Sequence, residues 1–200
     1  MDFEYDGRVL KFDKELSDLD KLVFNFIGLL EKAGAKYVIV SGYVAILLGR
    51  PRTTEDIDIY ISEVEFDKFL KLYGLLTKSD YWLVDSDSAE DAFDRLRKGL
   101  SIRTAKKDTV IPNFEMKFAK KETDFMSLNK PLEVVLNNRS LHVSPLEIQI
   151  PYKFLLSGEK DIEDALHIYE LFKEKLDKTK MRSVAKGLKV ENEMIKHGLI

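Results

Sequence analysis

Residues 37–61, YVIVSGYVAILLGRPRTTEDIDIYI, decide the expected fold. In order, they read as an apolar strand, a turn at Ser41 and Gly42, a short helix, a polar loop and a second strand that contains Asp56 and Asp58. Side chains alternate between the two faces of a strand, so we expect both acids on one face and the intervening isoleucines on the other. Two carboxylates held that close repel each other, and a divalent cation between them would remove the repulsion.

The segments around this stretch alternate between helical and extended patterns. Apolar residues recur at helical spacing over residues 19–30 and again over residues 66–73. Residues 114–118, FEMKF, alternate strictly between apolar and charged side chains, which is typical of a strand with one buried face. This order of elements predicts an α/β (α+β) domain with a mixed β-sheet flanked by helices.

The C-terminal part of the sequence predicts helices only. SPLE at residues 144–147 combines a hydroxyl, a proline and a glutamate at positions typical of a helix start. Further helices are expected near residues 160–172 and 179–196. We therefore expect an α/β core over residues 1–143 and a helical portion over residues 144–200, which packs on the core within one structural domain.

Composition narrows the functional classes. The net charge of −3 does not supply the general positive field of an indiscriminate nucleic-acid binder. The absence of cysteine excludes disulfides, thiolate metal ligands and a cysteine nucleophile. No apolar segment reaches membrane-spanning length and the N-terminus lacks a secretory pattern, so we expect a cytoplasmic protein with no membrane partner. Abundant Lys and Glu with a single glutamine lean towards a thermophilic source.

Residues 41–61 resemble the signature of the DNA polymerase β-like nucleotidyltransferase superfamily, in which a small-residue turn precedes a short helix and an acid-hydrophobic-acid strand. Within the superfamily, the run most resembles minimal nucleotidyltransferases and the toxin-type branch of AbiEii and MenT proteins. It matches their G-x-x-R-x-T-x-D-hydrophobic-D pattern at Gly49, Arg52, Thr54, Asp56 and Asp58.

A second segment, residues 141–172, resembles the later serine-proline, lysine and lysine-aspartate-x-x-aspartate helices of the family. Together the two segments cover about a third of the chain. The sequence departs from the family at the turn, where Gly-Gly or Gly-Ser is usual and Ser41-Gly42 reverses the order. The matching residues of the second segment are Ser144, Pro145, Lys153, Lys160, Asp161 and Asp164.

The resemblance implies a nucleotidyltransferase that uses Mg²⁺ or Mn²⁺. Such an enzyme transfers a nucleoside monophosphate from a nucleoside triphosphate, for example ATP, to a hydroxyl group by two-metal-ion catalysis and releases pyrophosphate. The acceptor would be an RNA (tRNA) end, a protein or a small molecule. Likeness to the toxin branch further implies a toxin-antitoxin role with an antitoxin-like protein partner.

The resemblance assigns catalysis and metal binding to Asp56, Asp58 and a third carboxylate. Glu115 shares the polar face of the FEMKF strand with Lys117, so it is placed to complete the metal site and to act as general base. Asp124 is its rival, because an acid followed by two hydrophobic residues also fits the pattern. The charged residues just before Asp124 resemble a turn, which favours Glu115.

Nucleotide-binding residues are expected in both matching segments. Backbone N–H groups at Gly42 and the Ser41 hydroxyl suit phosphate oxygens, and Arg52 and Thr53 precede the acids where a triphosphate would bind. Lys153 corresponds to the family lysine that approaches the nucleotide, with a snorkelling lysine as the alternative.

Thr54 is a further expected donor to the triphosphate. Three other residues, Arg50, Asp161 and Asp164, have a plain interpretation beside the functional one. Arg50 is interpreted equally well as a solvated loop charge and as a phosphate ligand. Asp161 and Asp164 have the positions of acids that stabilise a helix start.

Two other functions remain open from the sequence. One is a catalytically silent nucleotide-binding or interaction module of the same fold, favoured if Glu115 lies far from Asp56. The other is an unrelated α/β domain in which DIDIYI, residues 56–61, is only an edge strand.

Overall fold

The computed structural model describes residues 2–200, which form two compact units that interleave along the sequence. Unit 1 contains residues 2–14, 40–53 and 130–200, and unit 2 contains residues 15–39 and 54–129. Each unit has its own strands and helices. The expected division of the chain at residue 143 stays a prediction.

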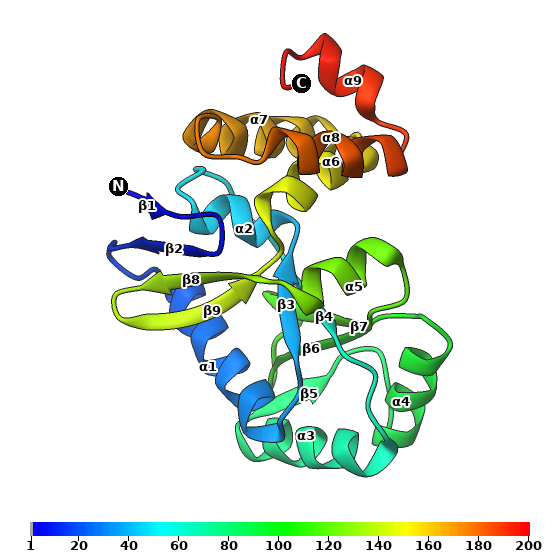
Figure 1. Cartoon of the computed structure of the whole chain (residues 1–200). Coiled ribbons are helices and arrows are strands. Elements are labelled where there is room, and N and C mark those ends of the chain that lie inside the picture. The colour runs from blue at the N-terminus through cyan, green and yellow to red at the C-terminus, as the bar shows by residue number, and fades with distance from the viewer. Residues whose placement is uncertain (1) are drawn as a thin grey trace. The chain divides into compact units, whose positions relative to one another are not determined.

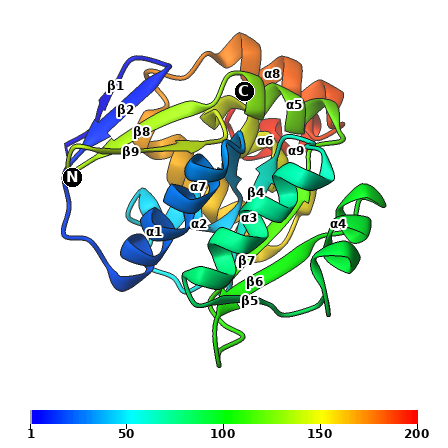
Figure 2. The same ribbon diagram turned by 90° about the horizontal axis from the view of Figure 1, so that it is seen from below.

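Unit 2 is built on a mixed sheet with the order β3-β4-β7-β6-β5. Strands β4 and β7 are parallel, whereas β7–β6 and β6–β5 are antiparallel. Because β4 lies between β3 and β7, the hypothesis of an edge strand at DIDIYI is wrong. Figure 2 shows β7, β6 and β5 side by side. The strands are β3 (Tyr37–Val40, of which residues 37–39 belong to this unit), β4 (Asp56–Ile61), β5 (Tyr81–Leu83), β6 (Ile102–Lys106) and β7 (Asn113–Phe118).

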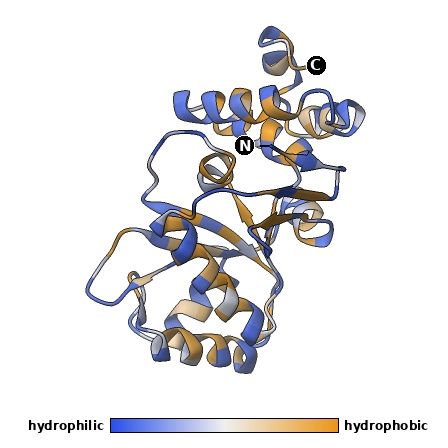
Figure 3. Cartoon of the chain, turned by 90° about the vertical axis from the view of Figure 1, so that its left-hand side faces the viewer, coloured by the Kyte–Doolittle hydropathy of each residue, from blue (hydrophilic) through white to orange (hydrophobic). Residues whose placement is uncertain are grey.

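Three helices of unit 2, α1, α3 and α4, bury apolar faces. At the start of α1, the Ser17 hydroxyl accepts a hydrogen bond from the Asp20 N–H, and the Asp20 carboxylate accepts one from the Ser17 N–H. Farther along α1, the Phe26 ring stacks on Phe114 of β7 with centroids 3.7 Å apart. Figure 3 shows both hydrophobic and hydrophilic residues on the helices, as expected for elements with one buried face. The helices are α1 (Asp18–Ala33), α3 (Phe66–Lys78), α4 (Ala89–Arg97) and α5 (Glu122–Asn129).

Unit 1 contains a second group of strands in the order β1-β2-β8-β9. The pairs β1–β2 and β8–β9 are antiparallel, and β2–β8 is parallel. Figure 1 shows β8 and β9 joined by a tight turn, with β2 beside β8. The strands are β1 (Glu4–Tyr5), β2 (Val9–Phe12), β8 (Leu132–Leu136) and β9 (Arg139–Val143).

In unit 1, α6 is buried along most of its length and contacts α7, α8 and α9 (Figure 1). The single helix expected over residues 179–196 is wrong, because the chain breaks after Gly187 and Lys189 adopts a positive φ of 62°. The helices are α2 (Gly42–Leu47), α6 (Leu146–Leu156), α7 (Glu159–Phe172), α8 (Lys178–Gly187) and α9 (Glu191–Lys196). Among residues 2–200, no helix combines the length and apolar character needed to cross a membrane.

Candidate functional site

Three carboxylates come together on the paired strands β4 and β7 of unit 2. Asp56 and Asp58 lie on β4, and Asp58 is in register with Glu115 on β7. The isoleucines of β4 are buried, whereas the two acids are exposed or half-buried, as the alternation predicted. One carboxylate oxygen from each of the three acids lies within 4.8 Å of the others. The structure therefore groups the predicted acids on one accessible face.

Polar neighbours hold two of these acids. The Thr54 hydroxyl donates to the Asp56 backbone carbonyl at 2.9 Å and to its carboxylate at 3.2 Å. Lys117 Nζ lies 2.7 Å from Glu115 Oε1. Partial burial raises the pKa of Glu115, but hydrogen bonds from Lys117 and Ser101 and the positive charges of Lys117 and Arg103 outweigh burial, so this pKa lies below its ordinary value. Glu115 is therefore ionised at neutral pH.

The donor set fits a hard divalent cation. Carboxylate oxygens are the ligands that Mg²⁺ and Mn²⁺ prefer. Two oxygens that share one Mg²⁺ ion lie at most about 4.2 Å apart, so small side-chain rotations from the observed separation of 4.8 Å or less are enough. The role of these residues as metal ligands stays a prediction that the geometry supports.

Asp124, the rival third carboxylate, has another structural role. It is buried in the first turn of α5, and its Oδ2 accepts hydrogen bonds from the Lys120 N–H at 3.1 Å and the Lys121 N–H at 2.9 Å. These bonds satisfy backbone groups at the helix start. Among residues 2–200, the group of acids suited to a metal contains Glu115 and not Asp124.

The predicted phosphate-binding turn lies in unit 1, before α2. Ser41 has φ 65° and ψ −132°, a backbone conformation that glycine adopts far more readily than serine. The Ser41 N–H donates to Gln149 Oε1 at 3.2 Å, and Gln149 Nε2 donates to the Ser41 carbonyl at 2.8 Å. Gly42, the next residue, is buried and begins α2. Sequence analysis missed Gln149, although a lone glutamine among apolar residues of a helix start is itself an unusual signal.

Lys153 is a buried cation and not a snorkelling surface lysine. Its side chain is 1% exposed, and its Nζ lies 2.6 Å from Asp161 Oδ1 and 2.9 Å from Asp164 Oδ2. The same Nζ is 3.5 Å from the Ser41 hydroxyl. Lys153 therefore connects the turn to two acids of α7, which explains why a charge is tolerated at this depth.

Arg50 and Arg52 join the same cluster of charges. Arg50 forms ion pairs with Glu163 and Asp164 and donates to the Lys160 carbonyl at 3.1 Å, so it is not a solvated loop charge. Arg52 Nη2 lies 3.3 Å from Asp164 Oδ2. Asp164 thus forms ion pairs with Lys153, Arg50 and Arg52. It therefore does more than stabilise a helix start, since it holds three cations together.

One feature of the cluster suits an anionic ligand. Arg52 Nε is buried and has no hydrogen-bond partner among residues 2–200. Buried donors are almost always satisfied, and a phosphate oxygen is a suitable acceptor for guanidinium. Thr53, the next residue along the chain, is exposed and accessible to a ligand.

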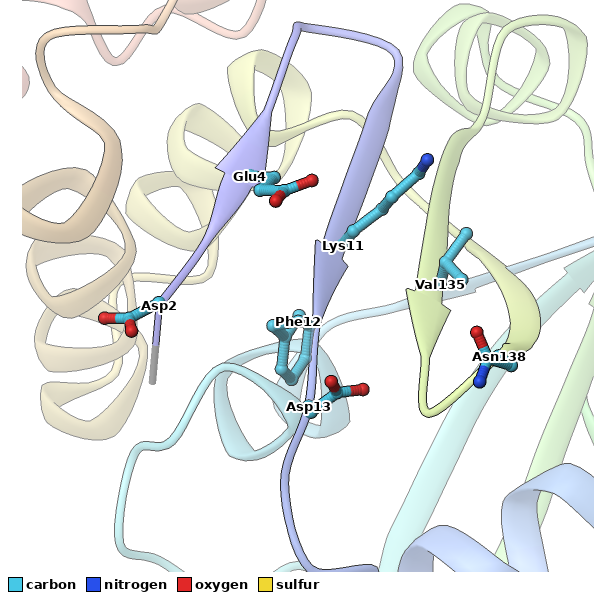
Figure 4. A pocket seen from close by; sticks show the side chains of 7 residues that line it. All are labelled: Asp2, Glu4, Lys11, Phe12, Asp13, Val135 and Asn138. Carbon is cyan, nitrogen blue, oxygen red and sulfur yellow. The ribbon is translucent and has the colours of Figure 1, made fainter.

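A separate hollow in unit 1 contains none of the predicted residues. It measures about 440 Å³ and lies by β1, β2 and β8 (Figure 4). Glu4 and Lys11, which are paired across β1 and β2, both line it. Its acids are exposed and none belongs to the group suited to a metal, so no function is assigned to it.

Solved structures of nucleotidyltransferases are similar to this chain. An antigenic nucleotidyltransferase-like protein from Paracoccidioides brasiliensis shares 19% identity over 91% of this chain and 92% of its own, with a TM-score of 0.57. ANT(2″)-Ia in complex with adenylyl-2″-tobramycin shares 13% identity over 88% of this chain and 99% of its own, with a TM-score of 0.60. A solution structure of ANT(2″)-Ia shares 13% identity over 91% of this chain and 98% of its own, with a TM-score of 0.57.

Neither a protein-family model nor a curated protein matches the sequence. At these low identities, the structural likeness establishes the fold. This chain has the mixed α/β fold of nucleotidyltransferases, as the sequence predicted. The narrower likeness to AbiEii and MenT proteins stays a prediction from the sequence.

Proposed function

We propose that this protein is a nucleotidyltransferase, which transfers a nucleoside monophosphate from a nucleoside triphosphate to a hydroxyl acceptor and releases pyrophosphate. The observation that carries the proposal is the group formed by Asp56, Asp58 and Glu115 in a chain with the nucleotidyltransferase fold. The alternative, a catalytically silent module, would be favoured if Glu115 lay far from Asp56. Their carboxylates are neighbours, so this argument for the silent module does not apply.

The three carboxylates would hold Mg²⁺ or Mn²⁺. When bound, such an ion supplies positive charge to the triphosphate and makes an acceptor hydroxyl more acidic. Glu115, kept ionised by Lys117 and Arg103, is in a state to accept a proton from that hydroxyl. Its strand pairing with β4 fixes its position relative to Asp58.

The nucleotide phosphates are assigned to residues of unit 1. Ser41 and Gly42 offer a hydroxyl and a backbone N–H, and Arg52 offers a buried N–H that lacks an acceptor among the described residues. Thr53 and Lys153 complete the expected set.

The test is transfer of label from each α-labelled nucleoside triphosphate, with Mg²⁺ or Mn²⁺, to total RNA, to protein and to hydroxyl-rich small molecules. Asp56→Asn/Asp58→Asn should abolish transfer. Asp124→Asn, which changes a nearby buried acid but keeps an acceptor oxygen for the α5 backbone, is the matched control and should retain it. Label transfer that survives the double substitution would refute the metal assignment, and nucleotide binding without transfer to any acceptor would favour the silent module.

An RNA acceptor has one supporting observation in unit 1. Three cations of α8 are spaced four residues apart, and so they lie on one face of the helix. With two hydroxyls they line a hollow of about 460 Å³. Glu191 partly neutralises them, through Arg182 at 2.9 Å and Lys186 at 3.9 Å. The residues of the hollow are Lys178, Thr179, Arg182, Ser183 and Lys186.

Salt dependence tests this acceptor. Lys178→Ala/Lys186→Ala should reduce the slope of log affinity for RNA against log salt by roughly 2, since each phosphate contact contributes about 1. An unchanged slope would exclude this surface. A toxin-antitoxin role, an antitoxin-like partner, a cytoplasmic location and a thermophilic source rest on the sequence alone.

A further inference from the structure

Ser41 is held in a backbone conformation that its side chain opposes. At φ 65° and ψ −132°, it lies near the mirror image of the extended region, where a Cβ meets backbone atoms and only glycine is common. Residues kept in such regions persist only when their surroundings force them, and they cluster at functional sites. Some contact in unit 1 must therefore hold Ser41 in place.

The side chain of Gln149 supplies that contact. A carboxamide presents an acceptor oxygen and a donor N–H side by side. The backbone of one residue offers the complementary pair, because its N–H donates and its C=O accepts. Gln149 receives the Ser41 N–H at 3.2 Å and donates to the Ser41 carbonyl at 2.8 Å, as a residue of a neighbouring strand would. Gln149 is 1% exposed and lies on α6, so a packed helix fixes the position of its amide.

We propose that Gln149 is a positioning residue for nucleotide binding, because its amide holds Ser41 in the glycine-like conformation that presents the turn to phosphate. This inference rests on the proposed function for the identity of the ligand. It also explains how the reversed order Ser41-Gly42 is tolerated where glycine is usual first: the strain of a serine at this position is balanced by two hydrogen bonds from a residue 108 positions away.

Loss of the amide would displace the groups assigned to phosphate. If Ser41 relaxed to a negative φ, the peptide that joins it to Gly42 would rotate, and this peptide carries the Gly42 N–H. The Ser41 hydroxyl would also leave its place 3.5 Å from Lys153 Nζ. The hydrogen bonds of Gln149 thus keep the Gly42 N–H and the Ser41 hydroxyl in one arrangement, without a direct contact from Gln149 to the ligand.

The experiment is a double-mutant cycle between the two residues. Gln149→Leu removes both hydrogen bonds at similar volume, and Ser41→Gly allows the backbone conformation without strain. Titration with a nucleoside triphosphate and Mg²⁺ should show that Gln149→Leu weakens binding roughly 10- to 100-fold in the natural background. In the Ser41→Gly background the same change should weaken it by less than about 3-fold. Glu147→Gln, which alters another buried polar residue of α6, is the control and should not change affinity.

An equal loss of affinity in both backgrounds, or no loss in either, would overturn the proposal. Thermal unfolding without nucleotide separates this outcome from a failure of the proposed function. If no nucleotide binds the natural protein, the proposed function fails. The positioning contact still predicts that Gln149→Leu lowers the Tm more in the Ser41→Gly background, because in the natural background Ser41 relaxes and the relief of its strain returns part of the loss. An equal drop in Tm would refute that contact. If Gln149→Leu does not fold, Gln149→Met, which also removes both hydrogen bonds but keeps a long, flexible apolar side chain, replaces it and should show the same pattern.

Discussion

Replacement of Lys153 by methionine is expected to destabilise the protein strongly. Lys153 is 1% exposed and pairs with Asp161 and with Asp164, whose side chain is fully buried. Methionine fills a similar volume but leaves the cluster with one uncompensated carboxylate. The buried negative charge, and not a cavity, is therefore the main source of the expected loss.

The magnitude follows from what remains around Asp164. Removal of one partner of a buried ion pair costs about 3–5 kcal/mol, and the lower limit applies because Arg50 and Arg52 still face Asp164. A loss of about 3 kcal/mol lowers the Tm of a chain of this size by roughly 6–12 °C. Adding Asp161→Asn removes the uncompensated charge and should recover about 1 kcal/mol.

Urea unfolding followed by circular dichroism measures these changes. Lys173→Met is the matched control, since Lys173 is 44% exposed and its Nζ lies 2.8 Å from Glu170, which is 65% exposed. It should change the free energy of unfolding by less than about 1 kcal/mol. A loss below about 1 kcal/mol for Lys153→Met, or no recovery with Asp161→Asn, would refute the buried ionic cluster.

Three further predictions concern unit 2. Ser17→Ala should cost about 1 kcal/mol in urea unfolding, because the cap of α1 is lost, and an unchanged midpoint would contradict the cap. Asp124→Ala should cost about 1–2 kcal/mol through its backbone hydrogen bonds and leave Mn²⁺ affinity unchanged. Burial raises the pKa of Tyr81 to about 12, above its ordinary value of 10.0. The neutral phenol therefore contributes to the free energy of unfolding in full below pH 10, and this contribution is lost as the pH rises towards 12, because the unfolded chain ionises first. Tyr81→Phe should flatten this alkaline loss in pH-dependent unfolding, and it removes a buried hydroxyl without a partner among the described residues.

Local patterns predicted the elements that carry the candidate site. The period of two at DIDIYI and FEMKF predicted β4 and β7 and the face on which their acids lie. Such patterns depend only on neighbours within a few residues, and burial of one strand face enforces them. The same patterns did not predict α5, whose polar and apolar residues show little periodicity.

Contacts between segments that are distant in the chain could not be predicted from local sequence patterns. Nothing local places Glu115 opposite Asp58, because that register depends on which strands become neighbours in the sheet. Likewise, the sequence around Lys153 predicted only a cation within a largely apolar helix. Its partners on α7, and the amide of Gln149 at Ser41, follow from how α6 packs within unit 1.

Mn²⁺ binding tests the central claim most directly. Electron paramagnetic resonance would count bound Mn²⁺ in the presence of a nucleoside triphosphate whose α-β bridging oxygen is replaced to prevent transfer. The natural protein and Asp124→Asn should bind the ion, whereas Asp58→Asn and Glu115→Gln should lose it. Equal binding by all four proteins, or loss only in Asp124→Asn, would contradict a metal site formed by Asp56, Asp58 and Glu115.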